Sequence, residues 1–248
     1  MTLIVGHRGA RNLWPENSLS GFRNLLTLPV KSVEFDVHLT KEGELLVIHD
    51  ATLDRTTERS GLVAELTKHE HREVHLKHGN GDVIPTLEEV LAVYRDTDLE
   101  LHVELKAGVN GVPCEGLEQR AAAMIDAFGL APQCFLTSFS LDVLITVREV
   151  APHIRRLASL HEKSIGDHGL RDRLEKILAV ADVVAVEKSL LQEQWDLITA
   201  FVPADRLGVW VPNEMADLSF WLSKPLRQIT TDRPDLAVKA QARLMHAD

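Results

Sequence analysis

The sequence predicts an α/β fold, a TIM (β/α)8 barrel with a small insertion after the second strand. Short runs rich in branched aliphatic residues alternate with longer amphipathic segments, which is the pattern of a parallel sheet covered by helices. The chain of 248 residues has the length of such a barrel. Polar and charged residues follow several apolar runs, at the strand ends where barrel enzymes carry their chemistry. We therefore expect residues 1–248 to form one domain.

Eight apolar runs have the length and the branched residues of buried strands. They are residues 3–6, 32–37, 99–105, 134–138, 155–160, 183–186, 207–211 and 228–231. Amphipathic helices are expected between most of them, at residues 18–28, 117–128, 141–150, 172–180 and 235–245. This alternation of strand and helix predicts a parallel barrel.

One additional strand departs from the alternation. Residues 44–48 follow the second strand after a linker, residues 40–43, that is too short for a crossover helix, so we expect a hairpin beside the barrel. Residues 51–84 are charged and rich in histidine and are expected to form the insertion at the barrel mouth, before Thr86 caps the next helix. We expect the histidines of the insertion to be solvated residues of a lid or loop, with a second metal site as the alternative. They are His69, His71, His75 and His78.

Charge and composition limit the partners. The 37 acidic and 27 basic residues give a formal net charge of −10 at pH 7, which argues against a broad nucleic-acid surface and leaves room for a local basic pocket. Residues 1–7 have neither a basic lead nor a long apolar stretch, so we expect no signal peptide, no stable membrane association and a cytoplasmic location. Cys114 and Cys134 lie in unrelated contexts and are expected to be small apolar residues. No feature predicts an oligomeric state.

The first candidate group for chemistry ends the first strand. In His7-Arg8-Gly9 an imidazole, a guanidinium and a glycine follow a buried run, with a polar strand cap as the alternative interpretation. Histidine exchanges protons near neutral pH, and arginine binds a phosphate through its planar fork. A second histidine, in His49-Asp50, follows the hairpin strand in the same way. The two imidazoles could therefore be the acid and the base that cleavage of a phosphodiester requires.

Three carboxylates predict a cation site. Glu34 and Asp36 are two residues apart on one strand, so both side chains point to the same face. Buried side by side they would repel each other without a cation or a proton, and oxygen ligands suit magnesium or calcium. Near the end of the third strand, Glu104 would be the third ligand and Lys106 a phosphate contact, with a surface ion pair as the alternative. Deeper in that strand, His102 is expected to be a hydrogen-bonded core residue.

These groups belong to a series of motifs that closely resembles the glycerophosphodiester phosphodiesterase family, in its bacterial, cytoplasmic type. The resemblance runs almost from end to end of the chain, and ten motifs in register make it specific. They are His7-Arg8-Gly9, Pro15-Glu16-Asn17-Ser18, Glu34-Phe35-Asp36-Val37, Lys41-Glu42-Gly43, His49-Asp50, Leu53-Asp54-Arg55-Thr56-Thr57, Ile84-Pro85-Thr86-Leu87, Glu104-Leu105-Lys106, Thr137-Ser138-Phe139 and Thr231-Asp232-Arg233-Pro234.

The resemblance implies an activity and a set of roles. The activity is metal-dependent hydrolysis of glycerophosphodiesters to glycerol 3-phosphate and an alcohol, a reaction of glycerol and lipid metabolism. His7 and His49 would be the general acid and base, and one divalent cation, Mg²⁺ or Ca²⁺, would be bound by Glu34, Asp36 and Glu104. In this family the glycerol hydroxyl is thought to attack phosphorus and give a cyclic phosphate. The residues themselves equally allow attack by metal-bound water.

Four further residues are expected to bind the small-molecule substrate. Arg8 and Lys106 would bind the phosphate, as the resemblance implies. Phe139 and Trp210 are candidates to line the glycerol pocket, with a place in the core as the alternative. Which alcohol is released stays open.

Two other classes of function fit part of this pattern. A lyase of the phosphoinositide phospholipase type, or a sphingomyelinase D-like enzyme, resembles this barrel and uses two histidines, but it would favour a membrane face. The sequence shows no basic or aromatic surface stretch for such a face. A non-catalytic phosphate-binding barrel would lack a proton carrier or a metal ligand, and none is missing. We therefore expect an enzyme, a phosphoric diester hydrolase that acts on soluble, deacylated headgroup esters.

Overall fold

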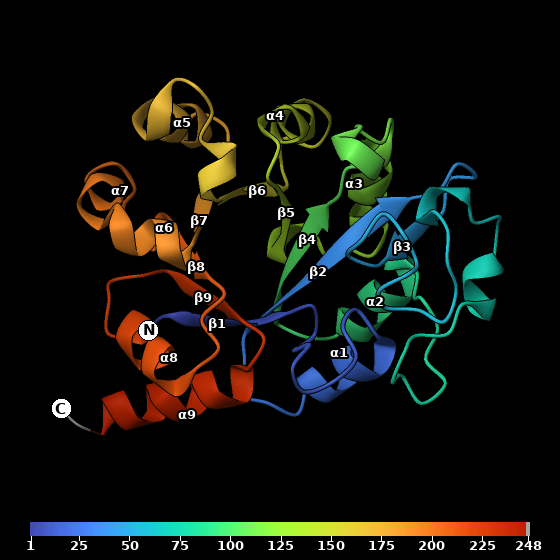
Figure 1. The fold of residues 1–248 in the computed structure, drawn as a ribbon, viewed down its shortest axis with the longest axis horizontal. Helices are drawn as coiled ribbons and strands as arrows, with labels where there is room; N and C mark the ends of the chain where they lie inside the picture. The colour runs from blue at the N-terminus through green and yellow to red at the C-terminus, as the bar shows by residue number, and fades with distance from the viewer. Residues whose placement is uncertain (247–248) are drawn as a thin grey trace.

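Eight parallel strands close into a barrel in the computed structural model, which describes residues 1–246, so that the last two residues of the expected domain lie outside the described part (Figure 1). The ring closes because β1 (Leu3–His7) pairs with both β2 (Ser32–Leu39) and β9 (Gln228–Thr231). The other strands of the ring follow in chain order: β4 (Glu100–Leu105), β5 (Cys134–Ser138), β6 (Arg155–Leu160), β7 (Val183–Glu187) and β8 (Leu207–Trp210). The predicted (β/α)8 barrel is therefore confirmed.

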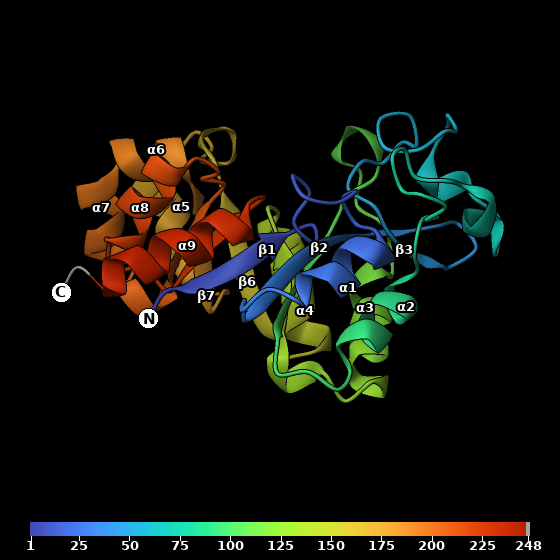
Figure 2. The same cartoon turned by 90° about the horizontal axis from the view of Figure 1, so that it is seen from below.

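The helices surround these strands in both ribbon views (Figures 1 and 2). They are α1 (Leu19–Leu25), α2 (Leu87–Tyr94), α3 (Leu117–Ala127), α4 (Leu141–Val150), α5 (Gly169–Leu178), α6 (Lys188–Glu193), α7 (Trp195–Phe201), α8 (Met215–Leu222) and α9 (Pro234–Met245). Several begin where the sequence places a capping side chain, as at Ser18, Thr86 and Ser140. Within residues 1–246, none of the helices has both the length and the apolar character needed to span a membrane.

The cap of α2 offers a test of local stability. The Thr86 hydroxyl accepts a hydrogen bond from the backbone N–H of Glu89, and the Glu89 carboxylate accepts one from the N–H of Thr86, which makes a capping box. We expect Thr86→Ala to lower the free energy of unfolding by about 1 kcal/mol, measured by urea denaturation. Thr86→Ser keeps the hydroxyl and should stay close to the original chain; equal losses in both variants would contradict the capping role.

The second strand continues beyond its expected end because it has a second partner. Its last residues pair antiparallel with β3 (Leu45–Val47), in the register Val37 to Val47 and Leu39 to Leu45. This is the predicted hairpin, and it extends β2 past the barrel. Within the ring, β2 pairs with β4 so that Glu34 lies opposite His102 and Asp36 opposite Glu104. The register therefore brings the two acids of β2 beside the acid of β4.

Both faces of β2 are buried, and they differ in chemistry. The aromatic ring of Phe35 packs edge-on against Phe22 of α1 at a centroid distance of 5.6 Å, and Phe22 in turn contacts Tyr94 of α2 at 6.1 Å. All three rings are fully buried. The Tyr94 hydroxyl donates a hydrogen bond to the carbonyl of Phe22. This apolar layer holds the outer face of β2 against the helices, which leaves Glu34 and Asp36 on the inner face.

The insertion is more ordered than a lid or loop. It contains two 3-10 helices, Val63–Glu65 and Glu70–Glu73, and its loops lie beside β3 at one side of the barrel (Figure 2). It has an apolar cluster of its own, separate from the main core and shared with the hairpin: Leu46, Ile48, Leu53, Val63, Leu66, Val74, Leu76 and Ile84. The expectation that its histidines are solvated was wrong for His71, which is 1% exposed and whose ring nitrogen Nδ1 lies 2.8 Å from the carbonyl of Ile84.

Candidate active site

A cavity of about 350 Å³ opens at the carboxyl ends of the barrel strands. Eight of the nine residues proposed from the sequence line it: His7, Arg8, Glu34, His49, Glu104, Lys106, Phe139 and Trp210. The ninth, Asp36, is fully buried and lies behind this wall, in contact with two of the lining cations. Parallel strands all end at the same rim, so residues distant in the sequence meet there.

The first histidine is held by an aspartate from the other end of the chain. His7 ends β1, and its Nδ1 lies 2.5 Å from Oδ1 of Asp232, which directly follows β9. Asp232 also accepts a hydrogen bond from the Asn213 amide at 2.8 Å and pairs with Arg11 at 2.9 Å. Burial opposes ionisation of Asp232, but the hydrogen bond to His7 lowers its pKa to about 2. With Nδ1–H bonded to a carboxylate, Nε2 is the ring nitrogen that His7 offers to the cavity.

The second histidine has the same kind of partner. His49 Nδ1 lies 2.6 Å from Oδ1 of Asp50, and Arg55 donates to both oxygens of that carboxylate. The hydrogen bonds from Arg55 lower the pKa of Asp50 to about 2. Arg55 also forms a two-pronged pair with Glu16, which accepts a further bond from Arg8. Burial lowers the pKa of His49 itself below its ordinary value. Both imidazoles therefore have a carboxylate at Nδ1 and keep Nε2 for other partners, and Nε2 of His7 lies 3.8 Å from Glu34 Oε2.

Three carboxylates meet between these histidines. One oxygen each of Glu34, Asp36 and Glu104 lies within 4.8 Å of the others. Burial, reinforced by the charges of Asp36 and Glu104, raises the pKa of Glu34 well above its ordinary value. Burial would also raise the pKa of Asp36, but the charges of Lys106 and Arg8 outweigh it and hold that pKa well below its usual range. The cluster thus carries one carboxyl that the protein's own cations do not neutralise.

The two cations of the site lie among these acids. Lys106 Nζ is 2.6 Å from Glu104 Oε1 and 3.0 Å from Asp36 Oδ1, and Arg8 Nε is 3.3 Å from Asp36 Oδ2. In the described structure Oε1 of Glu34 is buried without a hydrogen-bond partner. An all-oxygen cluster with more acids than cations and an unpartnered buried oxygen suits a hard divalent cation. The residues present therefore fit the predicted cation.

One wall of the cavity is apolar. The rings of Phe139 and Trp210 meet edge to face at a centroid distance of 5.6 Å, and the Trp210 indole donates a hydrogen bond to the carbonyl of Ala185. Leu157 and Ala185 extend this surface beneath the tryptophan. Phe139 and Trp210 are both partly exposed to the cavity. An aliphatic fragment such as a carbon backbone would contact this side, opposite the charged residues.

Sequence reasoning missed the residues that hold the site residues in place. Asp232, Glu16 and Arg55 belong to motifs that were recognised, but no role was assigned to them because each acts through another side chain. Asn213 was likewise assigned no role. The expectation that His102 is hydrogen-bonded was right, since it contacts Glu100 at 2.7 Å, but it also lines the cavity floor.

Comparison with known proteins gives a consistent picture. The model of the glycerophosphoryl diester phosphodiesterase family matches residues 7–236. A glycerophosphodiester phosphodiesterase of Bacillus altitudinis is 30% identical in an alignment of 254 positions, gaps included, that covers 96% of this chain and 98% of that protein. A glycerophosphodiester phosphodiesterase of Caldanaerobacter subterraneus subsp. tengcongensis is 35% identical over 159 residues, but the match spans only 65% of that protein and 62% of this chain.

A solved structure agrees with the fold over nearly the whole chain. The crystal structure of a glycerophosphodiester phosphodiesterase from Agrobacterium tumefaciens superposes with a TM-score of 0.77 at 25% sequence identity. The superposition covers 96% of this chain and 100% of the other.

Proposed function

This chain belongs to the glycerophosphoryl diester phosphodiesterase family, and we propose that it hydrolyses glycerophosphodiesters to glycerol 3-phosphate and an alcohol. The observation that carries the proposal is the placement of His7 and His49 on one cavity together with three clustered carboxylates. Cleavage of a phosphodiester needs a proton removed from the attacking oxygen and one given to the leaving alkoxide. The names of the relatives support the same activity.

The two histidines would be the general acid and base. Each donates its Nδ1–H to an aspartate, Asp232 for His7 and Asp50 for His49, so each presents Nε2 for proton exchange. The aspartate fixes the ring orientation and stabilises the imidazolium that forms when Nε2 takes up a proton. A pair of imidazoles held in this way can hand a proton to the leaving oxygen and receive one from the attacking oxygen.

The charged residues would bind the phosphate and a divalent cation. Glu34, Asp36 and Glu104 would hold the cation, Mg²⁺ or Ca²⁺, since their oxygens suit hard ions. When bound, the cation would neutralise charge on the phosphate and polarise it. Lys106 and Arg8 have N–H groups beside the same carboxylates and would donate hydrogen bonds to the phosphate oxygens.

The apolar wall would hold the glycerol carbons. Phe139 and Trp210 present ring surface to the cavity and no charge, so they favour the carbon backbone over the phosphate. The substrate would then be a soluble small molecule without acyl chains, whose glycerol and phosphate can both occupy the cavity. A cytoplasmic location stays a prediction of the sequence.

A headgroup panel tests this function. The purified protein is stripped with a chelator and then assayed with Mg²⁺ or Ca²⁺ on the glycerol esters of phosphocholine, phosphoethanolamine, phosphoinositol and phosphoglycerol, and on phosphatidylcholine vesicles. We expect release of glycerol 3-phosphate from at least one deacylated ester, loss of that activity in chelator and its return with a divalent cation. Activity on intact lipid alone would favour a phospholipase-type lyase, and full activity in chelator would contradict the metal.

The same assay distinguishes the two routes of attack. If the glycerol hydroxyl attacks phosphorus, a cyclic glycerophosphate forms first and is then opened by water. Phosphorus NMR of early time points would detect it. Direct attack by water gives glycerol 3-phosphate from the start.

A further inference from the structure

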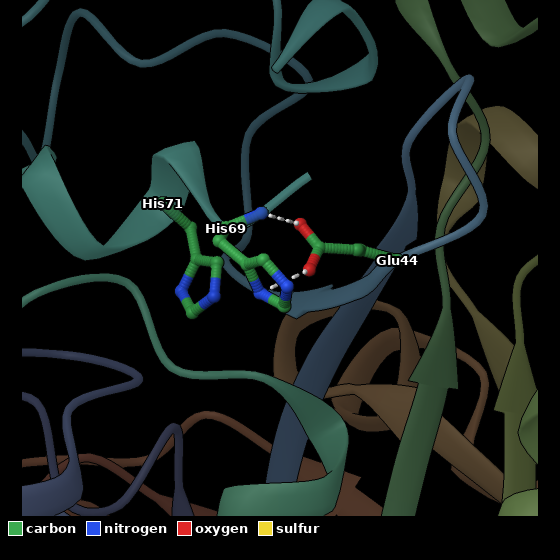
Figure 3. Close-up of side chains that lie close together, drawn as sticks. All are labelled: Glu44, His69 and His71. Carbon is green, nitrogen blue, oxygen red and sulfur yellow. Dashed lines mark hydrogen bonds and ion pairs between the residues drawn. The ribbon is translucent and has the colours of Figure 1, made fainter. Parts of the chain in front are cut away.

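A second cluster of potential metal ligands lies outside the cavity, where the hairpin meets the insertion. Glu44 directly precedes β3, and His69 and His71 lie at the start of the second 3-10 helix. One ligand atom of each residue lies within 4.8 Å of the others. Figure 3 shows the two imidazoles side by side and the Glu44 carboxylate next to His69.

His71 has a buried ring nitrogen that no described group satisfies. This residue is 1% exposed, and its Nδ1 lies 2.8 Å from the carbonyl of Ile84, so Nδ1–H is the donor there. The lone pair is then on Nε2, which is buried and has no hydrogen-bond partner in the described structure. Leaving such an acceptor unsatisfied costs about 1–3 kcal/mol. A histidine that donates Nδ1–H to a backbone carbonyl and offers Nε2 is the usual arrangement of a metal ligand.

The other two residues complete a set with the right spacing. Glu44 Oε2 accepts a hydrogen bond from the backbone N–H of His69 at 2.9 Å, which holds the carboxylate in place. Glu44 Oε1 lies 3.4 Å from His69 Nδ1. Two ligands bound to one tetrahedral ion at about 2.0–2.1 Å are separated by roughly 3.3 Å. The Glu44 and His69 pair is therefore already at the separation that shared coordination requires.

We propose that Glu44, His69 and His71 bind a zinc-like divalent ion, with water as the fourth ligand. Two imidazoles and one carboxylate form a donor set that suits Zn²⁺ and its neighbours, whereas Mg²⁺ and Ca²⁺ prefer oxygen alone. The site is thus chemically distinct from the three carboxylates of the cavity. The side chain of His69 is 55% exposed, so an ion can enter from solvent.

The ion would connect the insertion to the barrel. Glu44 belongs to the hairpin, while both histidines belong to the insertion, so coordination links two segments about 25 residues apart. An ion that binds the folded protein and not the unfolded chain raises stability by mass action. Its role would be structural, and it does not depend on the function proposed for the cavity.

Cobalt spectroscopy tests the site directly. Chelator-stripped protein is titrated with Co²⁺, which absorbs visible light strongly in four-coordinate sites with nitrogen ligands and weakly in oxygen-only octahedral sites. We expect one intense band that Zn²⁺ abolishes by displacing Co²⁺. His69→Ala should lose this band, while His75→Ala, which removes another exposed histidine of the insertion, should keep it.

Affinity and stability supply the second measurement. Removing a residue that only hydrogen-bonds to a metal ligand weakens metal affinity about 10- to 100-fold. Removing a ligand itself should therefore weaken Zn²⁺ binding at least about 100-fold. Glu44→Gln keeps an acceptor for the His69 N–H and should show the same loss. With Mg²⁺ in excess to occupy the three carboxylates of the cavity, added Zn²⁺ should raise the melting temperature of the original chain and of His75→Ala, and not that of His69→Ala or Glu44→Gln. An absent band in the original chain, or unchanged Zn²⁺ affinity in His69→Ala, would overturn the proposal.

Discussion

Replacing either His7 or His49 by alanine is expected to lower kcat on a glycerophosphodiester by about 10²–10⁴-fold, the range typical of a lost general acid or base. Each imidazole lines the cavity and is held by an aspartate at Nδ1, so its removal deletes a proton carrier without disturbing the barrel core. Both variants should fold, since neither ring is part of an apolar cluster. Steady-state release of glycerol 3-phosphate measures the loss, and circular dichroism checks the fold.

The leaving group separates the two roles. When the substrate is the p-nitrophenyl ester of glycerophosphate, p-nitrophenolate leaves as a stable anion and needs no proton. The variant that lacks the general acid should therefore regain most of its rate on that ester. The variant that lacks the general base should not. His168→Ala removes an exposed histidine that does not line the cavity and provides the matched control. Near-normal activity of His7→Ala or His49→Ala on natural esters would exclude that histidine from the pair.

Glu34→Gln is expected to have opposite effects on activity and on stability. Glutamine is nearly isosteric but carries no charge, so it weakens a cation site built from three carboxylates. Activity at ordinary Mg²⁺ or Ca²⁺ concentrations should fall by at least about 100-fold, since even the loss of a residue that hydrogen-bonds to a metal ligand lowers metal affinity 10- to 100-fold. In the metal-free protein the same change removes a buried charge that Asp36 and Glu104 repel.

The pH dependence of unfolding shows the sign of the effect of Glu34 on the stability of the metal-free protein. Because the folded pKa of Glu34 is raised above its unfolded value, the group stabilises the metal-free fold fully at pH values below about 4.5. That contribution is lost as the pH rises through the folded pKa. At pH 8 without metal, Glu34→Gln should therefore unfold at a higher urea concentration than the original chain. A lower midpoint would show that Glu34 is not repelled by its neighbours.

The affinity for the cation should also depend on pH. A carboxyl with a raised pKa must lose its proton before it can bind a cation, so the affinity of the original chain should rise with pH. In Glu34→Gln this dependence should be weaker. Calorimetric titrations with the cation at pH 6, 7 and 8 would measure both slopes.

The barrel and much of its site were predictable because the position of each strand and the alternation of its side chains are local properties of the sequence. All eight strands lie within two residues of their expected positions, since each is an apolar run followed by a polar strand end. The spacing of Glu34 and Asp36 placed both on one face, and the pairing of β2 with β4 then brought them to Glu104. What these residues do in catalysis stays a prediction.

Other features depend on contacts that no local pattern shows. Asp232 contacts His7 across 225 residues, and only ring closure brings them together. The burial of His71 follows from packing of the insertion on the hairpin, since by composition its segment resembles a solvated loop. The two short helices α6 and α7 between β7 and β8 were also not specified, because neither is long enough to show a clear helical period.

The pairing of β1 with β9, the first and last strands of the ring, has a consequence for synthesis of the protein. His7 leaves the ribosome early, but its partner Asp232 and its neighbouring strand β9 are made 225 residues later. At about 5–20 residues per second that interval lasts roughly 10–45 s. During this time the nascent chain carries its cation ligands and both imidazoles, yet the first imidazole has no carboxylate and β1 has one neighbour in place of two. The site is therefore assembled only after β9 and Asp232 have been made, and in a chain stalled before β9 the His7 imidazole would lack this carboxylate.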